Sequence, residues 1–344
     1  MSSLWFAIVA VMFVIYAVLD GFDLGVGIVY LLAGRTDAER RTLLGSIGPV
    51  WDGNEVWLIA GGGTLFFAFP AAYASGFSGF YLPLMMVLWL LILRGTAVEF
   101  RNHIVSPVWT PFWDVVFAGA SGLLALFFGA ALGNVLRGVP IDVDGNFFLP
   151  LWTNFRPGPN PGILDWFTIT IGITSVAVLA MHGALWATVR SAGNLQERAR
   201  GLASWSWLAA AILSVTVLLV VPLILPHFGR RYAARPWGLV FPTLAVVSLV
   251  SIKISSRATR DSTAFLCSCA YIVFMLAAAA FGHYPYLLPA IGDSQVSLTI
   301  FDASTSSSGL SIALSWFIPG TILVLAYFIF AYRRLLSRTD TAAN

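Results

Sequence analysis

The chain has 344 residues, of which 58% are hydrophobic, 14% aromatic and 10% charged, and its mean hydropathy is +0.85. A soluble domain carries about 25% charged residues, so this composition excludes a soluble enzyme, a disordered chain and a nucleic-acid-binding protein. The net charge of +3 arises from basic residues in short segments between apolar runs. In such segments basic residues set the orientation of a membrane protein.

Nine apolar runs are long enough to cross a bilayer, because each crossing needs about 20 residues. Every backbone polar group needs an internal partner in hydrocarbon, so these runs are predicted to be helices. The predicted fold is all-α, a polytopic membrane protein with about nine transmembrane helices in a single integral membrane domain over 1–344. The runs cover 4–32, 54–74, 79–100, 114–136, 164–189, 204–226, 238–255, 262–282 and 310–332.

The basic residues predict the orientation. An odd number of crossings places the termini on opposite sides, and thirteen of the basic residues then fall on the side of the C-terminus, against five on the other side and Arg94 within a span. The richer side is expected to be cytoplasmic, with the N-terminus outside and the C-terminus inside. The thirteen are Arg35, Arg40, Arg41, Arg101, Arg190, Arg198, Arg200, Lys253, Arg257, Arg260, Arg333, Arg334 and Arg338.

Two acidic residues fall within the first span. Asp20 and Asp23 are three residues apart and share a helix face. Gly21 and Gly25 form a GxxxG step, which lets another helix backbone approach closely. Ionisable groups within a span are costly and are functional candidates by default, so both carboxylates are expected to face protein or a wet cavity.

A second acidic pair opens the second span. Asp52 and Glu55 are again three residues apart and lie on the same side of the membrane as Asp20 and Asp23. Capping of the helix N-terminus is one interpretation of this pair. Four carboxylates gathered at one side also suit a proton path, because desolvated carboxylates can gain and lose protons. The glycine run 61–63 that follows suggests tight packing against a neighbour.

Arg94 ends the third span in apolar surroundings and needs an anionic partner. The sequence leaves open whether the resulting ion pair is structural or functional. The candidate partners are Asp23, Asp52, Glu99 and Asp114.

No metal site is predicted. Cys267 and Cys269 lie inside an apolar run, where their spacing makes neither a disulfide framework nor a zinc site. His182 is the one histidine deep within a span. A lone histidine in a helix bundle can ligate haem iron, but it is more often a hydrogen-bonded core residue.

Four motifs in order along the chain resemble subunit II of the cytochrome bd-type quinol oxidases. They are Asp-Gly-Phe-Asp-Leu-Gly-Val-Gly at 20–27, Trp-Asp-Gly-Asn-Glu-Val-Trp-Leu at 51–58, Gly133-Asn134 with Gly138-Val139-Pro140, and Tyr-Pro-Tyr-Leu-Leu-Pro at 284–289. The segment Asp-Ala-Ser-Thr-Ser-Ser at 302–307 resembles the same family.

The resemblance implies two four-helix bundles, at about 1–136 and 164–282, and a peripheral helix at 310–332. It implies a terminal oxidase that oxidises ubiquinol or menaquinol and reduces dioxygen to water, electrogenically, in a bacterial cytoplasmic membrane. Subunit I of the heterodimer is expected to carry two b-type haems, one d-type haem and the quinol site. This chain is expected to ligate no cofactor and to have no catalytic residue. A structural quinone, lipid and small single-span accessory subunits are its further candidate contacts.

By motif match, the resemblance makes Asp52 a proton-path residue, with Asp23 a second candidate. Asp20, Glu55 and Arg94 are candidates from spacing alone. Three alternatives stay open at this point: a secondary transporter, which would need an inverted repeat; a subunit that itself binds haem through His182; and an assembly scaffold with no conducting path.

Overall fold

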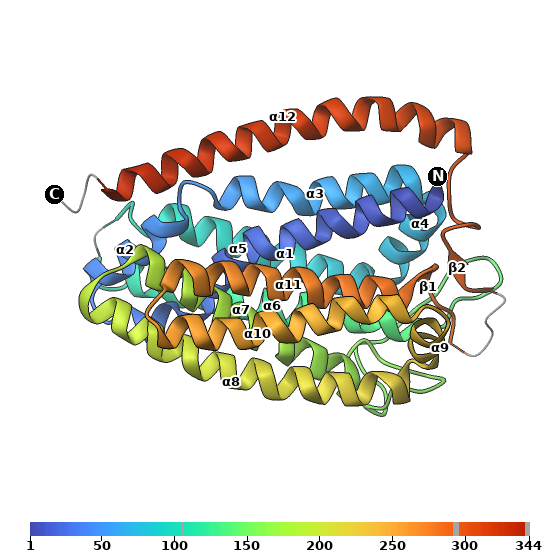
Figure 1. Cartoon of the computed structure of the whole chain (residues 1–344), viewed down its shortest axis with the longest axis horizontal. Helices are drawn as coiled ribbons and strands as arrows, with labels where there is room; N and C mark the ends of the chain where they lie inside the picture. The colour runs from blue at the N-terminus through green and yellow to red at the C-terminus, as the bar shows by residue number, and fades with distance from the viewer. Residues whose placement is uncertain (105, 292–295, 341–344) are drawn as a thin grey trace.

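The computed structural model describes residues 1–104, 106–291 and 296–340, the segment 334–340 by backbone alone (Figure 1). Long helices run along the long axis of the molecule: α1 (Ser2–Ala33), α3 (Trp51–Ala68), α5 (Tyr81–Phe100), α6 (Trp109–Arg137), α7 (Trp166–Arg190), α8 (Gly193–Ile224), α10 (Val240–Arg257), α11 (Asp261–His283) and α12 (Ser307–Asp340). The short elements are α2 (Asp37–Ile47), α4 (Pro70–Gly79), α9 (Pro226–Ala234), the 3-10 helix η1 (Pro236–Leu239), β1 (Tyr286–Leu288) and β2 (Leu298–Thr299).

The all-α polytopic membrane fold is confirmed, with one difference in the spans. Within the described residues, eight helices are long and apolar enough to cross a membrane. The second predicted span, 54–74, is divided between α3 and α4 by a break at Phe69, which precedes Pro70. Helix α3 is 18 residues long and lies beside α1 (Figure 1), but its first turns carry Asp52, Asn54 and Glu55, which lower its hydropathy below that of the other eight.

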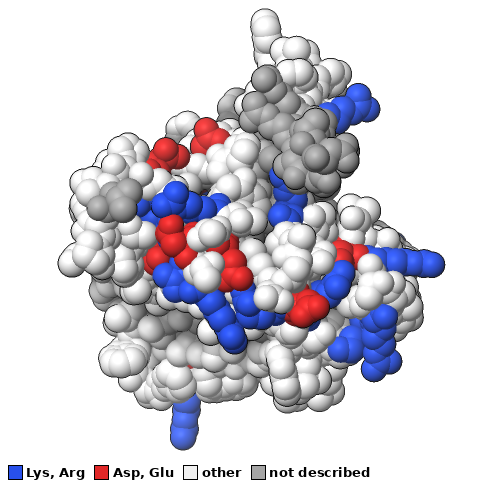
Figure 2. Space-filling view, turned by 90° about the vertical axis from the view of Figure 1, so that its left-hand side faces the viewer, with Lys and Arg blue, Asp and Glu red and all other residues white. Residues whose placement is uncertain are grey.

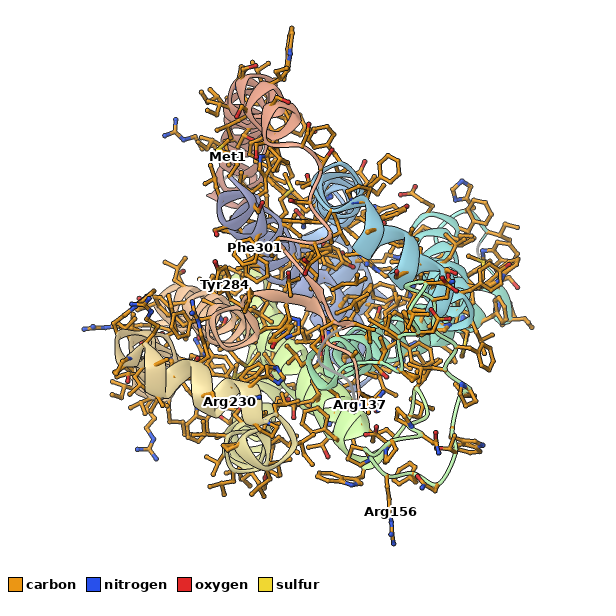
Figure 3. All side chains as sticks on the ribbon, turned by 90° about the vertical axis from the view of Figure 1, so that its right-hand side faces the viewer. Met1, Arg137, Arg156, Arg230, Tyr284 and Phe301 are labelled. Atoms are coloured by element: carbon orange, nitrogen blue, oxygen red, sulfur yellow. The ribbon has the colours of Figure 1, made fainter. Side chains whose placement is uncertain are left out.

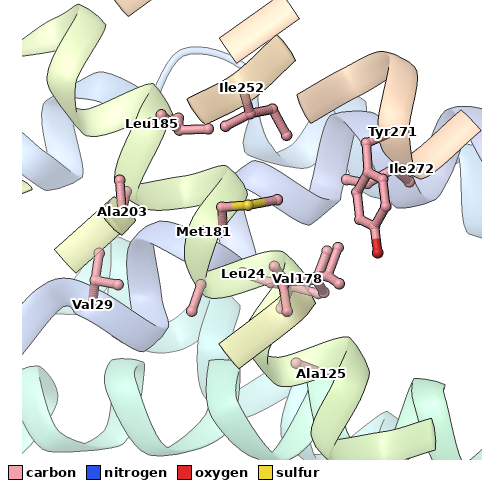
Figure 4. Close-up of a cluster of buried hydrophobic side chains, with 14 of the residues drawn as sticks. Leu24, Val29, Ala125, Val178, Met181, Leu185, Ala203, Ile252, Tyr271 and Ile272 are labelled. Atoms are coloured by element: carbon pink, nitrogen blue, oxygen red, sulfur yellow. The ribbon is translucent and has the colours of Figure 1, made fainter. Parts of the chain in front are cut away.

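Helix α7 is the most enclosed of these helices and α12 the least. In α7, 72% of the most apolar window is buried, against 0% in α12. The inner faces of α1, α6, α7 and α11 meet in one apolar cluster, to which α7 contributes Val178, Met181 and Leu185 (Figure 4). Helix α12 lies along one side of the molecule (Figure 1).

Glycines allow α1 and α7 to cross in backbone contact. A Cβ atom on Gly25 would overlap the Leu179 carbonyl oxygen, and one on Gly183 would overlap the backbone of Gly25. At Gly21 the nearest atom is a Leu179 methyl group, 3.0 Å from the Cβ position. The close approach predicted from the GxxxG step of α1 is therefore present, and its partner is α7.

The glycine run in α3 behaves differently. Gly61 faces the ring of Phe13, 3.1 Å from its Cβ position, whereas Gly62 and Gly63 have no heavy atom within 4 Å. The expected tight packing is wrong for these two residues, because they lie on the outer face of α3.

The two ends of the long axis differ in structure. We call them the α2 end, where α2 lies together with the start of α8 and the end of α12, and the α9 end, where α9, the N-terminus and the strands lie (Figure 1). At the α9 end β1 pairs antiparallel with β2, with Tyr286 opposite Thr299. Arg137, Arg156 and Arg230 all lie at this end (Figure 3).

Candidate functional site

The buried acids of α1 lie beside α3 and α5, closer to the α2 end of the molecule. Asp20 forms a two-fold ion pair with Arg94 of α5: Nη1 donates to Oδ2 at 2.9 Å and Nη2 to Oδ1 at 2.5 Å. Both side chains are removed from solvent, at 0% and 1% exposure. The partner of Arg94 is therefore Asp20, which was absent from the candidates Asp23, Asp52, Glu99 and Asp114. The sequence could not predict this pair, because only the packed structure shows which face of α1 meets α5.

Asp23 has a neutral partner instead. Asn54 of α3 donates a hydrogen bond from Nδ2 to Asp23 Oδ2 at 2.8 Å, and Tyr332 of α12 donates from its hydroxyl to Asn54 Oδ1 at 2.8 Å. Asp23 and Asn54 are both fully buried. A hydrogen-bonded chain thus runs from α12 through α3 to a carboxylate of α1, and no counter-ion contacts that carboxylate directly in the described residues.

Four buried polar atoms around these acids have no hydrogen-bond partner within the described chain. They are the Tyr16 hydroxyl, Asp23 Oδ1, Trp57 Nε1 and Arg94 Nε. Buried polar groups are nearly always paired, with ordered water serving where protein does not. This concentration of unpaired donors and acceptors distinguishes the cluster from the apolar core shown in Figure 4.

The second acidic pair leads from this cluster toward solvent. Asp52 is exposed, Glu55 is half-buried, and Asp20 and Asp23 are fully buried. Asp52 Oδ1 accepts a hydrogen bond from the backbone N–H of Gly53 at 2.8 Å, and no capping box forms, because the N-cap of α3 is Val50. The charge of Glu55 interacts with Arg94, Asp20 and Asp52. The four candidate carboxylates therefore form a series of increasing burial.

Asp114 belongs to a separate cluster. Its carboxylate accepts hydrogen bonds from Arg101 at 2.6 Å, Arg40 at 2.8 Å and the Tyr30 hydroxyl at 2.7 Å. These contacts connect α6 with α2, α1 and the end of α5. Glu99 is exposed. Neither acid pairs with Arg94, and Asp114, with three donors around it, serves as an anchor between helices.

Ion pairs also connect other elements at the α2 end, where basic and acidic side chains alternate across the surface (Figure 2). Arg198 of α8 pairs with Glu39 of α2. This contact and the backbone N–H groups of Arg35 and Thr36 lower the pKa of Glu39 to about 2. The hydrogen bond from the Arg101 side chain likewise lowers the pKa of Asp37.

His182 is a hydrogen-bonded core residue. Its Nδ1 lies 2.7 Å from the Ser268 hydroxyl oxygen and its Nε2 3.0 Å from the carbonyl oxygen of Val18. Its ring stacks on Phe265 at 4.9 Å between centroids. Since both ring nitrogens are engaged, His182 does not fit an axial haem ligand. Within the described residues, no group of three or more His, Cys, Asp or Glu side chains is placed to hold a metal ion.

Four residues in or beside the buried cluster, Tyr16, Asn54, Trp57 and Tyr332, were not among the predicted site residues. Asn54 lies inside the motif at 51–58, so its place between two acids is a signal that sequence reasoning can use. Tyr332 lies 278 residues from Asn54 along the chain. No local pattern marks it, because its role depends on how α12 packs.

The fold and the cluster define a class: an integral membrane protein of long helices, with buried carboxylates that contact an arginine and an asparagine near one end of the helices. The model of one family, cytochrome bd terminal oxidase subunit II, matches residues 1–335. The chain belongs to this family, and it is a subunit of a terminal quinol oxidase.

Named relatives agree along almost the whole chain. It is 32% identical to the probable cytochrome oxidase subunit 2 of Haemophilus influenzae, covering 98% of this chain and 94% of that protein. It is 31% identical to the cytochrome bd-I ubiquinol oxidase subunit 2 of Escherichia coli K12, covering 97% and 94%. It is also 31% identical to the cytochrome bd ubiquinol oxidase subunit 2 of Bacillus subtilis, covering 97% and 96%.

A solved structure supports the fold. The bd oxidase from Geobacillus thermodenitrificans matches with a TM-score of 0.76, covering 97% of this chain and 98% of that chain. Its sequence identity of 18% makes this a likeness of fold alone.

Proposed function

We propose that the buried acids of α1 and the acids of α3 form a proton route from the α2 end of the molecule toward a haem-bearing partner subunit. The observation that carries the proposal is Asp23. It is fully buried, its Oδ2 is held by the neutral amide of Asn54, and its Oδ1 has no protein partner among the described residues. A carboxylate without a direct counter-ion can exchange a proton at lower cost than one locked in an ion pair.

Asp20 and Arg94 have a different role in this proposal. Their two-fold contact pairs both charges, so we assign Asp20 a positioning role rather than a proton-carrying one. The pair places a fixed positive charge beside Asp23, and Arg94 interacts electrostatically with Asp23 and Glu55. The proposed route therefore uses Asp52 and Glu55 as the entry and Asp23 as the buried station.

The unpaired polar atoms supply the remaining steps. The Tyr16 hydroxyl, Trp57 Nε1 and Asp23 Oδ1 are buried without protein partners in the described chain, and such groups are ordinarily completed by water. Reduction of dioxygen to water consumes one proton for each electron. A hydrated route into the membrane at this position fits that demand, and water between carboxylates relays protons in hydrogen-bonded steps.

The proposal extends to the assembly. The relatives named above are subunit 2 of their oxidases, so the partner is a subunit I, which we propose carries two b-type haems, one d-type haem and the quinol site. When bound in the partner, the haems supply the electron transfer and the oxygen chemistry. A structural quinone, lipid and small accessory subunits are further proposed contacts of this chain.

Orientation follows from the charges. We place the α2 end at the cytoplasmic side of a bacterial inner membrane, because the basic residues concentrate there, with the N-terminus outside and the C-terminus inside. We also propose that 1–136 and 164–282 act as two four-helix bundles. In support, α1 packs on α3 and α6, and α6 on α5, while α7 packs on α8 and α11, and α11 on α10.

The experiment is Asp52→Asn in the purified complex. Loss of the entry carboxylate is expected to lower quinol oxidase turnover by roughly tenfold, the low end of the range over which local charge changes the supply of an ion. Haem content, read from the optical spectrum, stays near that of the wild type.

The matched control is Asp144→Asn, an exposed acid at the α9 end, for which turnover stays unchanged. Unchanged turnover in Asp52→Asn would remove this residue from the route. Loss of haem in Asp52→Asn would show that this residue has a structural role instead. Full turnover after neutralising all the entry acids would indicate that this subunit is an assembly scaffold with no conducting path.

A further inference from the structure

A cavity of about 180 Å³ lies at the α2 end among α7, α8, α10 and α11, away from the acidic cluster. Its cationic lining comes from Arg200 of α8 and from Lys253 and Arg257 of α10. Ser204 and Ser256 add hydroxyl groups to the same wall. The cavity therefore combines several cations with neutral hydrogen-bond donors.

The cavity carries uncompensated positive charge. Arg200 pairs with Asp261 at the start of α11, with Nε 3.1 Å from Oδ1 and Nη2 2.5 Å from Oδ2. Lys253 and Arg257 form no ion pair with any side chain in the described part of the protein. Two cations thus remain for a ligand, and an anion is the ligand that their charge selects.

Aromatic side chains place the cavity at the depth of lipid headgroups. The Lys253 ammonium lies 5.0 Å from the ring centroid of Trp207, whose Nε1 donates to the Leu249 carbonyl oxygen at 2.8 Å. The neighbouring Trp205 is 74% exposed. Tryptophan concentrates at the boundary between membrane and water, where lysine side chains extend toward the headgroups.

An apolar surface continues from the cavity toward the membrane centre. On α8, Leu208 and Ile212 are 44% and 58% exposed, and on α10, Val250 is 49% exposed. A free phosphate ion would use only the cations. A phospholipid uses both parts, with its phosphodiester among the cations and its acyl chains along α8 and α10.

We propose that this cavity is a binding site for the headgroup of an anionic phospholipid, with the phosphodiester held by Lys253 and Arg257 and hydrogen-bonded by Ser204 and Ser256. Basic pockets between transmembrane helices recognise anionic headgroups in this way. The site joins the start of α8 to the end of α10 through the bound lipid. It makes no use of the acids assigned to the proton route.

The test uses the complex purified in detergent, stripped of bound lipid and titrated with phosphatidylglycerol, phosphatidylcholine or inorganic phosphate. Retained phospholipid is counted by native mass spectrometry. The wild type is expected to bind phosphatidylglycerol in preference to phosphatidylcholine. The double variant K253Q/R257Q is expected to bind phosphatidylglycerol roughly 30-fold more weakly, because each cation near the headgroup contributes about a fivefold change.

The matched control is R35Q/R260Q, which removes the same charge from two exposed arginines at the same end and should bind as the wild type does. Ser204→Trp, which fills the mouth of the cavity without changing its charge, should also abolish binding. Equal lipid retention in wild type and K253Q/R257Q would overturn the proposal. Binding of inorganic phosphate as tight as that of phosphatidylglycerol would also overturn the proposal, since the site would then be one for a free anion.

Discussion

Asp20 and Arg94 show how the energy of a buried ion pair depends on keeping both members. Removing one leaves the other charge unpaired in a medium that solvates it poorly, at a cost of about 3–5 kcal/mol. Replacing both by apolar residues of similar volume leaves no such charge. The pair can therefore be tested by comparing single and double variants.

We predict that Arg94→Met strongly destabilises the complex, because the Asp20 carboxylate then has no cation within contact. The double variant Asp20→Leu/Arg94→Met should recover most of the loss. The thermal midpoint of haem release in the purified complex measures the loss in the single variant and the recovery in the double variant. The exposed pair of Asp37 and Arg41, whose side chains are 50% and 59% exposed, is the control, and Arg41→Met should cost no more than about 1 kcal/mol. Equal stability of Arg94→Met and Arg41→Met would refute the buried pair.

His227 of α9 gives a prediction about pH. Burial, and then the charge of Arg230, lower its pKa to about 4 from the ordinary value of 6.5. The unfolded chain therefore takes up a proton at this group before the folded chain does. Stability from His227 is full above about pH 6.5, and is lost as the pH falls toward 4.

We therefore expect His227→Gln to weaken the dependence of the thermal midpoint on pH between pH 7 and pH 5. His103→Gln, at an exposed histidine of the α2 end, should leave that dependence as in the wild type. Parallel melting curves of wild type and His227→Gln across this range would contradict the assignment.

At the scale of elements, the crossing of α1 and α7 depends on the absence of side chains. Gly25→Ala places a methyl group into the Leu179 carbonyl and the backbone of Gly183, so the helices must separate around the buried acids. We predict that this variant fails to assemble a haem-containing complex at wild-type yield. The comparison is Gly62→Ala in α3, which has open space around it and gains helix propensity of about 1 kcal/mol. Equal yields for the two would show that the crossing tolerates separation.

The sequence predicted most of the elements because their apolar runs are long and membrane helices must satisfy their own backbones. The GxxxG spacing also predicted that another helix backbone approaches α1 closely at Gly25. The sequence did not identify Gly183 as the partner or break the second span at Phe69, since both depend on how helices meet. The same limit explains why Asp20 was not paired with Arg94, and why Asp114 was grouped with Arg94 rather than with Arg101 and Arg40.

For the whole molecule, the arrangement of charge and termini is coherent. The N-terminus and the end of α12 lie at opposite ends of the long axis (Figure 1). The series from Asp52 to Asp23 opens at the α2 end, where most of the basic residues lie. The charges along the sequence predicted that the basic residues gather at one end, but the contact of Tyr332 with Asn54, which brings α12 to the acids, depends on packing alone.

The most direct test of the account is proton uptake by the fully reduced complex after it is mixed with oxygen, measured in Asp23→Asn. The amide keeps the shape of the side chain but cannot carry a proton. We predict that haem content and oxygen binding stay as in the wild type while proton uptake slows by roughly 100-fold or more, as for the loss of a proton-transfer group. Proton uptake at the wild-type rate in Asp23→Asn would contradict the proposed route.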